Sequence, residues 1–283
     1  MKRTVGFVDY YLNEWHANNY VGWIKDAADK LGEDFEVKYA FAELERDPKE
    51  GVTTDEWCKK FGVQKCESID ELCEKSDCII VLAPSNPETH LRYAEAVLKY
   101  KKNTYIDKTF APDFDTAKQI FGIAKSYGTN FFSTSALRYA PELLNTVGAV
   151  SMATTGGGSL FEEYLIHQVE MLIKTLGLDP KRVKTEGLDN GAKTVYVEFA
   201  SGKQGKMMYA PDNNFSVSVE FSDGKNYIEQ VNDGVVFAGL IEDMLRFFVN
   251  GKASFDTSET LAVSLVREAA IKSYINGGEW IAL

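Results

Sequence analysis

"SDCIIVLAPSNPETHLRYAEAVLKYKKNTYIDKTFAPDFDTAKQI" (residues 76–120) carries the clearest structural signal in this chain. It begins with a nearly all-apolar run, residues 77–83, as expected of a strand covered on both faces. Apolar residues then recur at helical spacing over 86–100, and the order repeats with a short run at 103–107 and a helical pattern over 114–128. Strands that alternate with helices predict a parallel, doubly wound sheet.

Three further apolar runs extend this pattern toward both sides, at residues 4–8, 36–42 and 129–135. We therefore predict a Rossmann-like domain over residues 1–135. In such sheets the ligand lies outside the carboxyl ends of the strands. The segments that follow those ends here are DYYLNE (9–14), APSNPETH (83–90) and DKTFAP (107–112).

After Pro141 the pattern changes. Residues 159–177 suggest a helix, and the alternating runs at 193–210 and 215–231 contain Gly turns typical of antiparallel hairpins. Two helical patterns then close the chain. We predict a second, α+β domain over residues 136–283 with a mainly antiparallel sheet. An open sheet of this kind with an apolar outer face would indicate a homo-oligomer.

Composition and charge favour a small-molecule partner. The 283 residues carry a formal net charge of -11, and no Lys- and Arg-rich cluster is present to neutralise phosphates, so nucleic acid and anionic membrane surfaces are excluded as partners. No run approaches the roughly 20 apolar residues of a membrane span, and the amino terminus shows no signal peptide. We expect a cytoplasmic protein.

The four cysteines, Cys58, Cys66, Cys73 and Cys78, lie close together in the sequence but form no C-x-x-C pair. Structural zinc sites favour such pairs, so we interpret these residues as reduced, mostly buried thiols. Elsewhere, Glu163, His167 and Glu170 lack the further His or Cys ligands of a metal centre. We predict no metal site.

Four stretches, taken together and in order, resemble the glucose-fructose oxidoreductase and inositol dehydrogenase (Gfo/Idh/MocA) family. Residues 76–120 look like the family's strand, its turn with proline and histidine, its helix and its Glu-Lys-Pro strand end, here Asp107-Lys108-Thr109. ALRYAPEL (136–143) looks like the domain crossover. Residues 156–177 resemble the G-G-G-x-L-x-D-x-G-x-H-x-x-D helix, and 261–283 look like the closing helix and strand.

The resemblance implies an oxidoreductase that moves hydride between NAD(H) and a hydroxyl of a sugar, polyol or cyclitol. Its reaction-centre Lys, Asp and His correspond to Lys108, Glu163 and His167. The spacing is consistent with this, because residues four apart, and Glu170 three further on, project from one face of a helix. His167 would take the hydroxyl proton, and Lys108 would stabilise the charge on the oxygen.

Glu162, at the acidic start of this helix, also has a purely structural interpretation as part of a helix cap. Ser159 and Glu162 have the S-x-x-E spacing of a capping box, which predicts that they begin the helix. The segment between Pro141 and Gly156, which precedes this helix, is short. Residues 142–155, 14 in all, are too few for the strand and long loop usual in the family, so we expect a truncated substrate side.

The cofactor site gives conflicting signals. The positions expected to contact a dinucleotide are Asp9, Tyr11, Leu12, Glu43, Pro84, Asn86 and His90. Glu43, at the end of the second strand, matches the acidic residue that binds an adenosine ribose and disfavours a 2'-phosphate, which indicates NAD; a solvated strand-end carboxylate is the alternative.

The glycines of a G-x-G-x-x-G fingerprint are replaced by Asp9, Tyr11 and Glu14. A unit like-charge pair about 4 Å apart costs about 4 kcal/mol at an effective dielectric of about 20. We therefore predict that NAD binds weakly or not at all by the usual route. Two functions stay open: an NAD-linked oxidoreductase with a reshaped turn, or a cofactor-free descendant that is a non-redox enzyme or a ligand-binding regulatory protein.

Overall fold

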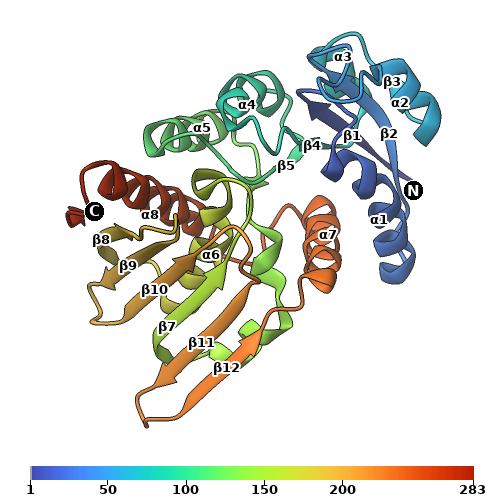
Figure 1. The fold of residues 1–283 in the computed structure, drawn as a ribbon. Helices are drawn as coiled ribbons and strands as arrows, with labels where there is room; N and C mark the ends of the chain where they lie inside the picture. Colours follow the sequence, from blue (N-terminus) through green and yellow to red (C-terminus); the bar gives the residue numbers. More distant parts are fainter. Residues whose placement is uncertain (1) are drawn as a thin grey trace. The chain divides into compact units, whose positions relative to one another are not determined.

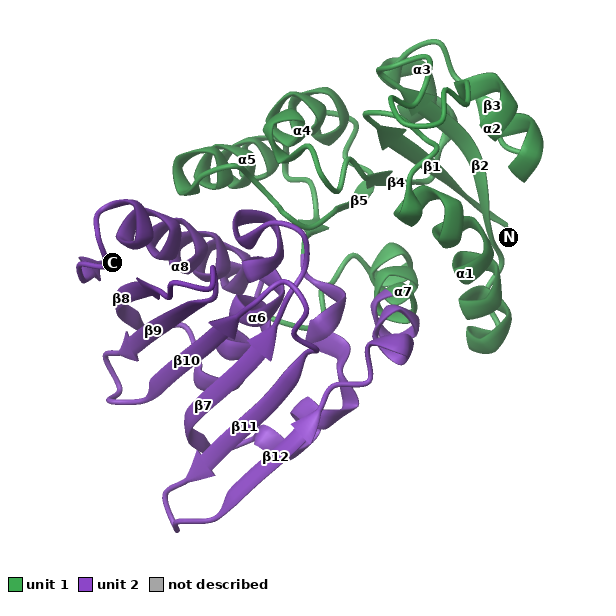
Figure 2. Cartoon of the chain, viewed as in Figure 1, with its two compact units in different colours: residues 1–133, 241–255 green, residues 134–240, 256–283 purple. Residues whose placement is uncertain are grey.

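The computed structural model describes residues 2–283, which form two compact units (Figure 2). Unit 1 consists of residues 1–133 and 241–255, and unit 2 of residues 134–240 and 256–283. The sequence pattern placed all of 136–283 in one domain, whereas the segment 241–255 here belongs to unit 1.

Unit 1 is built on a six-stranded parallel sheet with the strand order β3-β2-β1-β4-β5-β6 (Figure 1). This is the strand order of the dinucleotide-binding Rossmann fold, and it confirms the predicted doubly wound sheet. The strands are β1 (Arg3–Asp9), β2 (Phe35–Ala42), β3 (Gln64–Lys65), β4 (Cys78–Val81), β5 (Asn103–Ile106) and β6 (Phe131–Phe132). The edge strand β3 has only two residues, too few to leave a periodic signal in the sequence.

The helices of unit 1 are α1 (Trp15–Leu31), α2 (Thr54–Phe61), α3 (Ile69–Lys75), α4 (His90–Leu98) and α5 (Phe114–Tyr127), with a short 3-10 turn η1 (Pro87–Thr89) before α4. The helix α7 (Asp233–Asn250) contributes its second half. There, Phe247 packs edge-on against Phe132, with ring centroids 4.9 Å apart, and Phe248 packs against Phe35 at 6.3 Å. This late segment therefore completes the core of unit 1.

All four cysteines lie buried in unit 1 and form no disulfide, which confirms the predicted thiols. Burial raises the pKa of Cys58, Cys73 and Cys78 to about 12 and that of Cys66 to about 11. Thiols with such pKa values are poor nucleophiles and metal ligands. In residues 2–283 no three His, Cys, Asp or Glu side chains are grouped to hold a metal ion.

Unit 2 contains a seven-stranded sheet with the order β12-β11-β7-β10-β9-β8-β13 (Figure 1). Only β7 and β10 pair in parallel among its described neighbours, so the sheet is mainly antiparallel, as predicted. The strands are β7 (Ala149–Gly156), β8 (Pro180–Gly187), β9 (Lys193–Phe199), β10 (Gln204–Tyr209), β11 (Ser216–Phe221), β12 (Asn226–Gln230) and β13 (Ile281–Ala282).

The helix α6 (Phe161–Leu176) packs on β7 and β10, and α8 (Ser258–Ile275) packs on β8 (Figure 1). Two 3-10 turns, η2 (Ala136–Tyr139) and η3 (Pro141–Thr146), precede the sheet. Residues 142–155 contain most of strand β7 but no long loop, because η3 leads almost directly into that strand.

Three consecutive glycines fix the approach to α6. A Cβ on Gly157 would lie 2.1 Å from the carbonyl oxygen of Ala210, and one on Gly158 would lie 2.1 Å from the ring of Tyr164. Gly158 also has a backbone φ of 145°, a value that residues with a side chain rarely adopt. The helix itself begins after Leu160, which caps it without a side-chain hydrogen bond, so the predicted Ser159–Glu162 capping box is wrong.

The outer face of the second sheet is charged over β8 and β9, so the apolar face considered as a sign of oligomers is absent there. Arg182 and Glu198 form a bidentate pair with both distances 2.7 Å, and Lys184 pairs with Glu186 at 2.6 Å. Separately, no helix within residues 2–283 has the length and apolar character needed to cross a bilayer.

Candidate functional site

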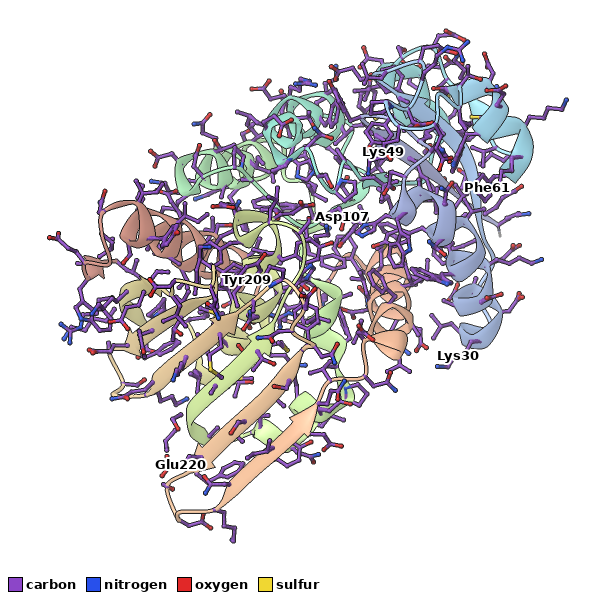
Figure 3. The ribbon with its side chains drawn as sticks, in the orientation of Figure 1. Lys30, Lys49, Phe61, Asp107, Tyr209 and Glu220 are labelled. Atoms are coloured by element: carbon purple, nitrogen blue, oxygen red, sulfur yellow. The ribbon has the colours of Figure 1, made fainter. Side chains whose placement is uncertain are left out.

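The carboxyl edge of the parallel sheet in unit 1 holds a buried polar cluster. Asp107, labelled in Figure 3, follows β5. It is 0% exposed. Its Oδ2 is in hydrogen-bond contact with Nδ1 of His16, and its Oδ1 accepts from the Tyr105 hydroxyl at 3.1 Å and from the Lys108 backbone N–H at 2.8 Å. Burial alone would raise the pKa of Asp107, but the His16 imidazole and then Lys108 hold it below its ordinary value. Asp107 is thus a carboxylate anchored by His16.

Asp9, the last residue of β1, is 1% exposed and has a different character. Its Oδ1 accepts the backbone N–H groups of Tyr10 at 2.7 Å and Ala83 at 3.0 Å, while its Oδ2 has no hydrogen-bond partner among the described residues. Burial, and next the charge of Glu14, raise the pKa of Asp9 well above its ordinary value. These conditions favour the neutral acid.

Glu14 occupies the amino-terminal end of α1. It is the N-cap residue, and its carboxylate accepts the backbone N–H of His16 at 2.7 Å and that of Ala17. These first-turn N–H groups are the ones that a dinucleotide-binding domain offers to a diphosphate. Burial raises the pKa of Glu14. The helix start in this chain therefore already carries a carboxyl cap of its own.

The residues of this turn do not fit the diphosphate of a dinucleotide. Glu14 uses the two N–H groups, Asp9 lies buried beneath, and Leu12 is buried in the core while Tyr11 is half-buried. Residues 9–14 contain no glycine, and a glycine is what would let the backbone approach a phosphate closely. Binding by the usual route would require the Glu14 carboxylate to leave the helix end.

Glu43 lies directly after β2, at the position expected to meet an adenosine ribose. Its Oε2 accepts from the Tyr93 hydroxyl at 2.8 Å and from Arg92 Nε at 3.1 Å, with Arg92 Nη2 also in contact. Burial acts to raise the pKa of Glu43, but Arg92 and Tyr93 bring it below its ordinary value. Because a guanidinium stands beside this carboxylate, Glu43 opposes a 2'-phosphate less than the sequence suggested.

Pro84, Asn86 and His90, the predicted cofactor positions that follow β4, have different surroundings. His90 is fully buried, with Nε2 2.7 Å from the Leu82 carbonyl oxygen and Nδ1 3.0 Å from that of Phe110. Its pKa is lowered by burial, so the neutral ring can donate to only one of them. Asn86 donates to the Glu88 carboxylate at 3.0 Å.

Lys108 is half-buried and lies at the same sheet edge. Its Nζ donates to the Pro84 carbonyl oxygen at 3.4 Å, and the peptide bond that joins it to Thr109 is cis. The ammonium group therefore lies next to one of the predicted cofactor residues. Parallel sheets of this order bind their ligands at this edge.

In unit 2, α6 carries Glu163 and His167. His167 is half-buried between the rings of Tyr164 and Phe215, at centroid distances of 5.7 and 5.8 Å, and its Nδ1 lies 2.7 Å from the Ser135 hydroxyl oxygen. That oxygen also accepts the backbone N–H of Leu137 at 3.2 Å. The imidazole is therefore held in a defined orientation.

The two carboxylates near His167 on α6 have different surroundings. Glu163 is half-buried, and its charge is among those that act to raise the pKa of Arg267, which burial lowers. Glu170 is buried and pairs with Arg138 Nε at 2.6 Å; it also accepts from the Thr134 hydroxyl at 2.7 Å. Arg138 contacts Glu259 as well. Glu170 thus belongs to a buried ion network.

Sequence reasoning missed Ser135 and the pairing of His16 with Asp107. Ser135 is 32 positions from His167, and His16 is 91 positions from Asp107. No local pattern links residues so far apart. For His16 and Asp107 the available signal was that both follow predicted strands of one parallel sheet, whose carboxyl ends meet at one edge.

Comparison with known proteins gives a family match for part of the chain. Residues 33–135 match the family GFO_IDH_MocA, described as an oxidoreductase family with an NAD-binding Rossmann fold. A curated Escherichia coli (strain K12) protein, "Uncharacterized oxidoreductase YhhX", is 33% identical over 60 residues, which are 21% of this chain and 17% of that protein. The chain thus matches about a sixth of the length of this relative.

Solved structures match over nearly the whole chain. A probable dehydrogenase from Thermotoga maritima has a TM-score of 0.80 and 14% identity, with 99% of this chain and 98% of that chain covered. The myo-inositol dehydrogenase from Lactobacillus casei, in complex with NAD(H) and myo-inositol, has a TM-score of 0.80 and 9% identity, with 100% and 97% covered. At such identities the likeness shows the fold alone. Residues 33–135 are therefore similar in sequence to the NAD-binding Rossmann domain of the Gfo/Idh/MocA oxidoreductase family, and the chain shares the fold of these dehydrogenase structures.

Proposed function

We propose that this chain is an oxidoreductase that acts with NAD(H) on a hydroxyl group of a sugar, polyol or cyclitol, with Lys108, Glu163 and His167 at the reaction centre. The observation that carries the proposal is the fixed imidazole of His167, half-buried and held at 2.7 Å by the Ser135 hydroxyl. An oriented imidazole with one nitrogen already engaged is the arrangement of a general base. The related myo-inositol dehydrogenase binds a cyclitol.

In this proposal His167 takes the proton of the substrate hydroxyl, and the ammonium of Lys108 stabilises the negative charge that develops on the oxygen. Glu163, one turn before His167, favours the protonated imidazole by its charge. Lys108 belongs to unit 1 and the other two residues to unit 2.

The turn at residues 9–14 does not fit a diphosphate, because Glu14 occupies the first N–H groups of α1. A second function is favoured by that same observation: the carboxylate of Glu14 already caps α1. A chain that has lost the dinucleotide would be a non-redox enzyme or a ligand-binding regulatory protein that keeps the hydroxyl-binding residues.

A pair of titrations separates the two functions. NADH binding is followed by energy transfer from tryptophan, since Trp15 and Trp23 lie on α1, and thermal shift is measured with a panel of sugars, polyols and inositols. An oxidoreductase should bind NADH and reduce NAD in the presence of one of these compounds. A shift with a hydroxyl compound, without NADH binding or turnover, would favour the cofactor-free function.

We also propose that the protein works in the cytoplasm and forms a homo-oligomer. Four free, buried cysteines are usual in a reducing compartment. Leu144, Val147 and Ile228 of unit 2 are strongly exposed apolar residues, and association of copies would cover them. Light scattering after gel filtration tests this, and a monomer at micromolar concentration would contradict it.

A further inference from the structure

We propose that Ser135 is a positioning residue for His167: its hydroxyl oxygen accepts the Nδ1–H of the imidazole and so keeps Nε2 as the nitrogen that takes the substrate proton. This role rests on the proposed function of His167 as the base. The distance from Oγ to Nδ1 is 2.7 Å, within the range of a good hydrogen bond.

The position of Ser135 is itself fixed. It is the N-cap residue of η2, where its Oγ accepts the backbone N–H of Leu137 at 3.2 Å, and its backbone N–H points to the Glu170 carboxylate at 3.4 Å. Glu170 is in turn paired with Arg138. A 1% exposed serine held at both ends is a rigid partner for a side chain on another element.

The hydrogen-bonding capacity of the two groups then sets the tautomer. A neutral imidazole has one N–H and one acceptor nitrogen, so a base that works through Nε2 must carry its proton on Nδ1. A serine oxygen has two acceptor sites. One serves Leu137, and the second lies in reach of Nδ1. When His167 becomes protonated, Nδ1–H stays on the same oxygen, so the ring keeps its orientation through the transfer.

The chain is well suited to a direct test, because it contains only three histidines. Nitrogen-15 NMR of the imidazoles distinguishes Nδ1–H from Nε2–H tautomers, and His167→Gln assigns the signal. We compare wild type, Ser135→Ala and Ser135→Thr, which keeps the hydroxyl. The matched control is Ser264→Ala, a buried serine of α8 whose hydroxyl donates to the Thr260 carbonyl oxygen at 2.9 Å.

Wild type, Ser135→Thr and Ser264→Ala should show neutral His167 with its proton on Nδ1. Ser135→Ala should shift the ring toward Nε2–H and move its titration to lower pH by about half a unit to one unit, because an acceptor that favours the imidazolium is lost. In a turnover assay, Ser135→Ala should lower kcat with little change in KM, with the pH profile moved in the same direction.

An Nε2–H tautomer in the wild type, or a spectrum that Ser135→Ala leaves unchanged, would overturn the role of Ser135. Failure of the proposed function would look different: His167→Gln would keep full turnover on a compound that the protein converts. The NMR result stands independently of turnover, so the two failures are distinguishable.

Discussion

The side-chain carboxyl group of Glu14 accepts the backbone N–H of His16 at 2.7 Å and thereby caps the start of α1 from within the same chain. In a dinucleotide-binding domain a bound diphosphate makes this contact. The missing glycines of the turn are therefore only part of the difference from such a domain, because the N–H groups they would expose are also taken.

Weak NAD binding follows from this cap. We expect little thermal shift of the wild type at millimolar NAD, whereas a ligand at a hundred times its dissociation constant would add about 2.7 kcal/mol of stability. Glu14→Gln, which removes the charge and keeps the size, should strengthen NADH binding modestly. The triple variant Asp9→Gly, Tyr11→Gly, Glu14→Gly should strengthen it more.

Calorimetry with NADH and with inorganic pyrophosphate as a probe measures both effects. Tight NAD binding by the wild type, with the diphosphate over residues 9–14, would show that Glu14 leaves the helix end on binding. If the triple variant also failed to bind NADH, the cofactor-free function would be favoured.

Asp9 predicts an unusual pH dependence of stability. Its pKa is raised in the folded state, so between its ordinary value of about 3.9 and the raised value the folded protein binds more protons than the unfolded chain. Its contribution to stability is therefore full at low pH and is lost as the pH rises through that window. The Asp9→Asn variant has a neutral amide at this position, which does not titrate.

We expect the stability of Asp9→Asn relative to wild type to increase from pH 4 to pH 8, measured by urea unfolding at several pH values. Asp107→Asn is the comparison with the opposite sign and is measured below pH 4, because the pKa of Asp107 is lowered and its contribution to stability disappears as the pH falls toward that lowered value. A constant difference between Asp9→Asn and wild type would show that Asp9 is ionised normally.

The buried ion network of unit 2 should be sensitive to truncation. Arg138→Ala leaves the carboxylates of Glu170 and Glu259 without their shared cation, and we expect a loss of about 3–5 kcal/mol in the free energy of unfolding. Arg182→Ala breaks the exposed pair with Glu198 and should cost no more than about 1 kcal/mol. Equal effects of the two variants in urea unfolding would contradict the buried network.

The reaction-centre residues make a kinetic prediction. For a hydroxyl compound that the protein converts, His167→Ala should lower turnover by about 10²–10⁴, as is usual for loss of a general base. Lys108→Met should lower kcat as well, whereas Lys118→Met, at an exposed lysine of α5, should have no effect. Steady-state kinetics measure all three, and normal turnover of His167→Ala would remove it from the mechanism.

The fold was predictable in large part because its signals are local. Runs such as residues 77–83 and the hairpin turns after Pro141 reflect burial and turn chemistry in the immediate sequence. The site was less so. Which carboxylate keeps its charge depends on partners brought by folding. Asp107 has His16, whereas one oxygen of Asp9 has no hydrogen-bond partner within residues 2–283, although both residues belong to the carboxyl ends of parallel strands. The spacing on α6 likewise grouped Glu170 with His167. In the folded protein, however, Glu170 forms an ion pair with Arg138.

The rings of Phe132 and Phe35 in unit 1 are covered by Phe247 and Phe248, which the ribosome adds more than a hundred residues after Phe132. Synthesis must therefore reach residue 248 before the first unit can complete its core. Until then, the apolar surface around Phe35 and Phe132 stays exposed, and exposed apolar surface of this kind promotes aggregation. A fragment that ends near residue 135 inherits this exposure permanently.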